Sequence, residues 1–171
     1  DAIQSQVDEL QGELATLATG MQLSETETEL PAEARLVVGR QRQSHNLSCE
    51  SSAVSMVAQS FGLELSESEV LAALPLHDNP HLGFRGNVDG PTGGTQDYGV
   101  YAGPILDILH DRGLQAWPVK GGLDGIRSAI VRGHPVIAWV TYNCQTSTPE
   151  TISVDGETVV LVPWQHVVVV T

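Results

Sequence analysis

Basic residues are scarce in this chain. Only 8 Lys and Arg stand against 21 Asp and Glu, which leaves a formal net charge of −13, and Lys120 is the only lysine. A protein that binds nucleic acid or anionic lipid through a broad surface needs clustered positive charge. The composition therefore argues against partners of that kind and favours a well-solvated protein.

Long apolar runs and cysteines are scarce as well. No stretch reaches the roughly 18 apolar residues of a membrane span, so we expect no membrane insertion by this chain, and no signal peptide is visible. The two cysteines, Cys49 and Cys144, are too few for a disulfide-stabilised scaffold. The chain begins at Asp1 without a methionine. We interpret it as a trimmed or mature fragment from which a signal or an anchor has been removed.

The apolar residues of the N-terminal segment recur in steps of four and three. They are Ile3, Val7, Leu10, Leu14, Leu17 and Met21. This heptad pattern predicts a helix over residues 1–22, which either packs on its own domain or serves as a stalk or a self-association surface. Residues 23–34 are acidic and include Pro31. We therefore expect a heptad helix and linker over residues 1–34 and a second domain over residues 35–171.

In this second domain, helix patterns come first and strand patterns follow. Apolar periodicity and end signals predict helices over residues 48–62, 66–75, 105–113 and 123–133. Ser66 and Glu69 have the spacing of a capping box. Alternating or β-branched runs predict strands over residues 114–120, 135–142 and 164–171, and a hairpin over residues 150–162. This order predicts an α+β fold with an antiparallel sheet.

Residues 77–104 form a long segment with seven glycines and three prolines in 28 residues. Such a composition cannot sustain a regular element, and a loop of this length inside a compact domain is usually functional. We expect it to border a functional site. Tyr98, Gly99 and Tyr101 are then candidate substrate contacts, although the two tyrosines could instead pin the loop to the core.

Cys49 is the candidate nucleophile because it stands where a polar loop turns into a predicted helix. Free N–H groups and the dipole at a helix N-terminus stabilise a thiolate, so we expect more thiolate than in a free cysteine. A cysteine nucleophile also needs a base. Among six histidines, His166 opens a valine-rich strand, which is a rigid mount. Gln43, six residues before Cys49, offers an amide donor for an oxyanion.

Four stretches carry a resemblance to a known family. They are Gln43 with the following "CESSAVSMVAQSFG", then "NPHLGFRG", "DYGVYAGPI" and "WQHVVVVT". Over about residues 38–171 the chain resembles the papain superfamily of cysteine peptidases. It is most similar to the branch of the bacterial double-glycine leader peptidases, of the stand-alone, extracytoplasmic type. The resemblance implies an extracytoplasmic location, either secreted or membrane-anchored.

The resemblance also implies a fold and a set of roles. A central helix carrying the nucleophile Cys49 would pack on a twisted antiparallel sheet carrying His166, the general base and then acid. Gln43 would complete the oxyanion hole, and Trp164, beside His166, would pack on the site or shield it. The Asp or Asn that orients the imidazole normally follows on the next strand. The chain ends five residues after His166, so we expect that residue beyond Thr171, or else an incomplete triad.

Other interpretations stay open. Cys49 could be an inert buried residue or could pair with Cys144 in a disulfide. His77 and His81 are four residues apart, which on a helix would suit a metal pair, but Pro80 and the nearby glycines favour a loop. Asn87, Asp89 and Asp97 could form a calcium loop, but their spacing matches no strong motif. We expect no metal and no cofactor.

The sequence thus favours a cysteine peptidase, or a related thiol acyl-transfer hydrolase, that cleaves peptide bonds in a peptide or protein substrate. The first alternative is a catalytically inactive papain-like module that binds a peptide or a cell-wall fragment. The second alternative is a membrane-tethered assembly protein whose heptad helix is the working part.

Overall fold

The computed structural model describes residues 30–171. The chain divides into two units between Pro31 and Ala32. The heptad helix predicted over residues 1–22 lies outside the described residues and stays a prediction. The following paragraphs concern the second unit, Ala32–Thr171.

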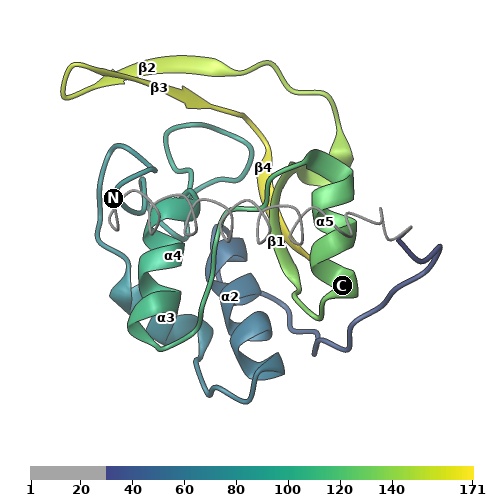
Figure 1. The fold of residues 1–171 in the computed structure, drawn as a ribbon. Helices are drawn as coiled ribbons and strands as arrows, with labels where there is room; N and C mark the ends of the chain where they lie inside the picture. Colours follow the sequence, from purple (N-terminus) through teal and green to yellow (C-terminus); the bar gives the residue numbers. More distant parts are fainter. Residues whose placement is uncertain (1–29) are drawn as a thin grey trace, which may run out of the picture. The chain divides into compact units, whose positions relative to one another are not determined.

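Four helices are present in the described part of the chain, and each overlaps a helix predicted from the sequence. They are α2 (Cys49–Ser60), α3 (Glu67–Ala73), α4 (Ala102–Asp111) and α5 (Gly122–Val131), labelled in Figure 1. The capping box at α3 is confirmed, since the Ser66 side chain accepts from the Glu69 N–H and the Ser66 N–H donates to the Glu69 carboxylate at 2.8 Å. Helix α4 begins three residues earlier than predicted, because Pro104 is tolerated in a first helical turn.

The strands form two separate antiparallel pairs in the described residues, where the sequence predicted a single sheet. Strand β1 (Val136–Thr141) pairs with β4 (Gln165–Val170), and His166 lies opposite Val140. Strand β2 (Glu150–Val154) pairs with β3 (Glu157–Leu161). Asp155 and Gly156 join β2 to β3 with φ of 51° and 83°, as expected for the predicted two-residue hairpin turn. The short 3₁₀ helix η1 (Tyr142–Cys144) follows β1 directly.

The strand predicted over residues 114–120 is wrong. Its alternation does place Leu114 and Ala116 against the main core. However, no neighbouring strand pairs with this segment among residues 30–171. Pro118 also lacks the N–H group that a sheet ladder requires. The segment is therefore irregular in structure.

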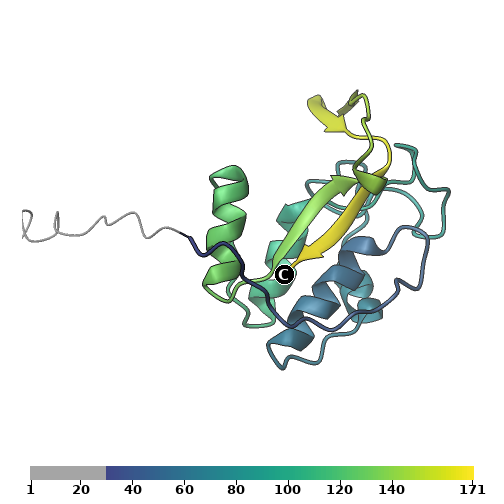
Figure 2. The ribbon, with the colours of Figure 1, turned by 90° about the vertical axis from the view of Figure 1, so that its right-hand side faces the viewer.

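The β1–β4 pair forms the centre of the arrangement. Helix α2 packs against β4 and helix α5 against β1, so that α2 and α5 lie on opposite sides of the pair (Figures 1 and 2). The β2–β3 hairpin extends beyond one end of this pair (Figure 1). The architecture is thus α+β.

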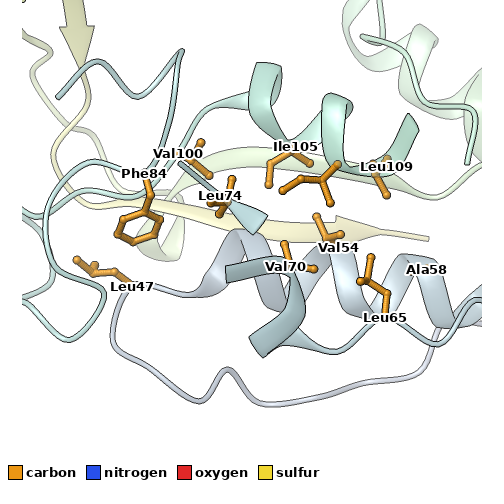
Figure 3. Packing of buried hydrophobic residues seen from close by; sticks show 11 residues of the cluster. Leu47, Val54, Ala58, Leu65, Val70, Leu74, Phe84, Val100, Ile105 and Leu109 are labelled. Carbon is orange, nitrogen blue, oxygen red and sulfur yellow. The ribbon is translucent and has the colours of Figure 1, made fainter. Parts of the chain in front are cut away.

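Apolar residues of α2, α3 and α4, and of the segments before and between these helices, make the main core. Figure 3 shows their side chains pointing toward one another. The buried members are Leu47, Val54, Ala58, Leu65, Val70, Leu74, Phe84, Val100, Ile105, Ile108 and Leu109. A smaller cluster of Cys49, Ala53 and Val167 lies where α2 meets β4. This contact holds the start of α2 against the start of β4, and both starts contribute to the candidate site.

Candidate active site

Cys49 is the first residue of α2 and is only 8% exposed. The preceding residue, Ser48, does not cap the helix with its side chain. Its hydroxyl instead donates to the His45 carbonyl at 3.2 Å and accepts from the His45 N–H at 3.1 Å. The Ser48 side chain therefore stabilises the loop before α2 and leaves the first turn of the helix to other partners.

A cavity of about 780 Å³ adjoins Cys49, and the three residues predicted for catalysis all line it. Gln43 comes from the loop before α2, Cys49 from the start of α2 and His166 from β4. A smaller cavity of about 380 Å³, between residues 38–43, α2 and β4, is lined by the same three residues. The fold thus brings together residues that lie 117 positions apart in the chain, Cys49 and His166.

The glycine-rich segment also reaches this cavity. Thr92, Gly93 and Tyr98 line the larger cavity, and a β-bridge between Arg85 and Gly99 closes the loop on itself. The Arg85 guanidinium strengthens that closure by donating to the Thr95 carbonyl at 2.8 Å. The segment therefore borders the candidate site, as its composition predicted.

The thiol of Cys49 is not poised as a thiolate. Its sulfur donates to Oε2 of Glu50 at 3.3 Å. Burial raises the pKa of Cys49, and the charge and hydrogen bond of Glu50 raise it further, while the backbone N–H groups of Val167 and Glu50 lower it by less. The expectation of an enlarged thiolate fraction at the helix N-terminus is therefore wrong, because desolvation and a neighbouring carboxylate outweigh the helix terminus.

His166 is the second residue of β4 and is half-buried. Burial lowers its pKa, which favours the neutral imidazole, the form that can accept a proton. Its ring meets that of Tyr142 edge to face, with centroids 5.8 Å apart. Within residues 30–171 the ring makes no hydrogen bond to Cys49 or to an orienting carboxylate.

Gln43 lies at the cavity, but its amide is already engaged. Nε2 donates to the His45 carbonyl at 2.8 Å and to the Asn46 carbonyl at 2.9 Å. These two bonds use both amide hydrogens. In this arrangement Gln43 shapes the loop before α2, and it must release one bond before it can donate to an oxyanion.

Glu50 is the site residue that sequence reasoning missed. It is 1% exposed, and its carboxylate accepts from the Val100 N–H and from Nε2 of Gln165, each at 3.1 Å. An acidic residue in the first turn of a helix is ordinarily read as a surface charge that favours the dipole. The available signal was its position directly after Cys49, as the only charged residue of that helix.

The candidate substrate contacts separate into two groups. Tyr98 and Trp164 line the larger cavity, whereas Gly99 and Tyr101 are not among its lining residues in the described chain. The Tyr98 hydroxyl bonds to that of Tyr101 at 2.7 Å and accepts from the Val162 N–H at 2.9 Å. The Tyr101 hydroxyl donates to the Val160 carbonyl. Both tyrosines therefore tie the glycine-rich loop to β3 and the residues after it, which favours the pinning interpretation.

Trp164 forms a partly exposed wall of the cavity. Its backbone is in the left-handed region, with φ of 62°, and its carbonyl accepts from the Tyr142 N–H at 2.7 Å. The indole lies on Gly93, where an added Cβ would come within 2.7 Å of the ring. A strained non-glycine residue beside a cavity is a common mark of a functional site.

The described residues also bear on the cysteine pairing and on the metal interpretations. Both cysteines are free, with Cys49 buried and Cys144 exposed. In residues 30–171 no group of three or more His, Cys, Asp or Glu is arranged to hold a metal, and the Asp97 carboxylate accepts instead from the Asn87 N–H. None of the helices described is long and apolar enough to cross a membrane.

The chain was also compared with known proteins. No family model, no curated protein and no solved structure matches it. The candidate site itself offers a thiol and an imidazole that line one cavity, with a buried carboxylate bonded to the thiol.

Proposed function

We propose that this chain is a cysteine peptidase, or a related thiol acyl-transfer hydrolase acting on peptide bonds, with a papain-like arrangement of helix and sheet. One observation carries the proposal. Cys49, at the start of α2, and His166, on β4, line the same two cavities. A nucleophile at a helix N-terminus and a base on an adjoining strand form the basic pair of thiol acyl transfer.

The proposed reaction starts from uncharged Cys49 and His166 side chains. Burial favours the uncharged form of both Cys49 and His166, so the resting site holds a thiol and an imidazole rather than an ion pair. The sulfur attacks the carbonyl carbon while its proton passes to His166, which then protonates the departing amine. Water hydrolyses the resulting thioester by the same proton path, which releases the acid and restores the thiol.

The cavity suits a peptide. Its volume of about 780 Å³ lies within the usual range for ligand sites, roughly 300–1,000 Å³. Trp164 and Tyr142, 45% and 52% exposed, present aromatic surface along the wall that His166 shares. Polar residues of the loop before α2, among them Gln41, Ser44 and Asn46, line the cavity as well and supply polar surface for an extended peptide backbone.

A second candidate function has its own support. The Cys49 thiol is bonded to Glu50, and the Gln43 amide is bonded to loop carbonyls. A site that stays in this state would bind a peptide without cleaving it. A peptide-binding module of the same fold is therefore the alternative to the enzyme.

Replacing His166 separates the two candidates. We expect His166→Ala to lower peptide hydrolysis by about 10²- to 10⁴-fold, the usual contribution of a general base. The assay incubates a defined peptide mixture with the protein and follows products by mass spectrometry. His134→Ala is the matched control, because the His134 ring packs on Trp117 and lines neither cavity. Equal activity of His166→Ala and wild type would refute the proposed role, and binding without any cleavage by the wild type would favour the module.

A further inference from the structure

Glu50 is a buried carboxylate that the proposed reaction leaves without a role. It follows the candidate nucleophile directly and is among the largest fully buried side chains of residues 30–171. A buried carboxylate is costly unless its oxygens are well satisfied. Its position and its contacts therefore call for an explanation.

Three elements meet at this carboxylate. Oε2 accepts from the Cys49 thiol at 3.3 Å, while Oε1 accepts from the Val100 N–H and from Gln165 Nε2, both at 3.1 Å. The donors belong to α2, to the glycine-rich loop and to β4. Gln165 also precedes His166, so Glu50 connects the nucleophile to the strand that carries the base.

The loop is shaped to admit this carboxylate. Gly99 adopts a φ of +111°, and a Cβ at this position would overlap Oε1 of Glu50. A side chain there would separate the loop from α2. The close approach of the Gly99 backbone therefore allows the Val100 N–H to reach the carboxylate.

We propose that Glu50 is a positioning residue that holds Cys49 as a neutral thiol between turnovers, an inference that rests on the proposed function. The Cys49 hydrogen points at Glu50 rather than at His166, and the nucleophile is masked until this hydrogen bond breaks. A carbonyl bound in the cavity then reacts as His166 takes the proton. A small electrophile that diffuses in meets a thiol of low reactivity.

The surrounding charges agree with this role. Burial raises the pKa of Glu50, and the hydrogen bonds from Gln165, Val100 and Cys49 lower it by less. All three partners donate to Glu50, which is the pattern that favours an ionised carboxylate. Its negative charge opposes the formation of a second anion on the adjacent sulfur. The other titratable residues that line the larger cavity are Arg42, His45, Tyr98, Tyr142 and His166, and Arg40 lines the smaller one. Among the described residues, none of these basic side chains forms a salt bridge with Glu50, and burial disfavours the protonated imidazole of His166.

The test is the pH–rate profile of Cys49 alkylation by iodoacetamide, read by peptide mass spectrometry. Glu50→Gln keeps the size of the side chain and removes its charge. We expect the midpoint of the profile to move to lower pH, and the rate at pH 7 to rise about tenfold for each pKa unit of that shift. Cys144, which is exposed, serves as the reference thiol in every sample.

Glu67→Gln is the matched control. Glu67 is a second buried glutamate, on α3, and it accepts from the Ser44 N–H at 2.9 Å and from the Gln41 amide. It has no bond to Cys49 among the described residues. Its replacement should leave the alkylation midpoint of Cys49 unchanged.

The outcomes are distinct. If Glu50 does not act on the sulfur, Glu50→Gln leaves the midpoint unchanged in a protein that keeps the near-ultraviolet circular dichroism of the wild type, which overturns the proposal. Should this variant fail to fold, Glu50→Asp takes its place. The shorter side chain withdraws the carboxylate from the sulfur, so the midpoint should again move to lower pH, and an unchanged midpoint overturns the proposal. Peptide hydrolysis is scored separately. If the midpoint shifts but no peptide is cleaved, the proposed peptidase activity is refuted and the role of Glu50 in masking the thiol stands. If peptide is cleaved but the midpoint does not shift, only the role of Glu50 is refuted.

Discussion

Cys49→Ala is expected to lower the rate of peptide hydrolysis by at least about 10³-fold, because removing a nucleophile leaves only the binding and oxyanion contributions of the site. The helix itself should tolerate the change. Cys49 packs against Ala53 and Val167, and alanine is the best helix former. The thermal transition of the variant, recorded beside its activity, distinguishes lost chemistry from lost structure.

Cys144→Ala is the matched control for this loss. Cys144 is exposed, free and located in η1 after β1. Its replacement should leave hydrolysis within about twofold of the wild type, as for most surface substitutions. Hydrolysis that survives in Cys49→Ala and disappears in Cys144→Ala would move the nucleophile to Cys144 and contradict the assignment.

Gly99→Ala is expected to destabilise the fold by about 3 kcal/mol. An alanine at φ of +111° is strained, and its Cβ would overlap the buried Glu50 carboxylate. The overlap would also separate the Val100 N–H from its acceptor. Urea denaturation followed by circular dichroism measures the change in the free energy of unfolding.

Gly113→Ala provides the comparison for this prediction. Gly113 also has a positive φ, of +79°, but a Cβ there meets nothing within 4 Å. Gly113→Ala should therefore lower the free energy of unfolding only by the backbone strain, about 1 kcal/mol. Similar losses in the two variants would mean that the contact between Gly99 and Glu50 adds nothing to stability.

Most secondary structure was predictable because local signals determined it. The Ser66–Glu69 capping box fixed the start of α3, and Asp155-Gly156 fixed the turn between β2 and β3. The strand predicted over residues 114–120 is absent because a strand needs a pairing partner, and distant parts of the chain determine where partners lie. The single sheet expected from the sequence became two pairs for the same reason.

The residues of the candidate site could be predicted from the sequence, whereas their protonation and hydrogen bonding could not. Residue type and position pointed to Cys49, His166 and Gln43, and these line one cavity. The pKa direction of Cys49 could not be read from position alone, because burial and the Glu50 contact act through the folded structure. Nor could the sequence show that loop carbonyls occupy the Gln43 amide.

The most direct test of the central claim is covalent capture by a peptidyl vinyl sulfone, with the label located by mass spectrometry. Such an electrophile reacts when a bound peptide places it against the nucleophile. If Cys49 and His166 form an acyl-transfer pair in this cavity, one label should appear on Cys49, labelling should drop strongly in His166→Ala, and Cys144 should stay unmodified. Labelling of Cys144 alone, or equal labelling of Cys49 with and without His166, would contradict the account.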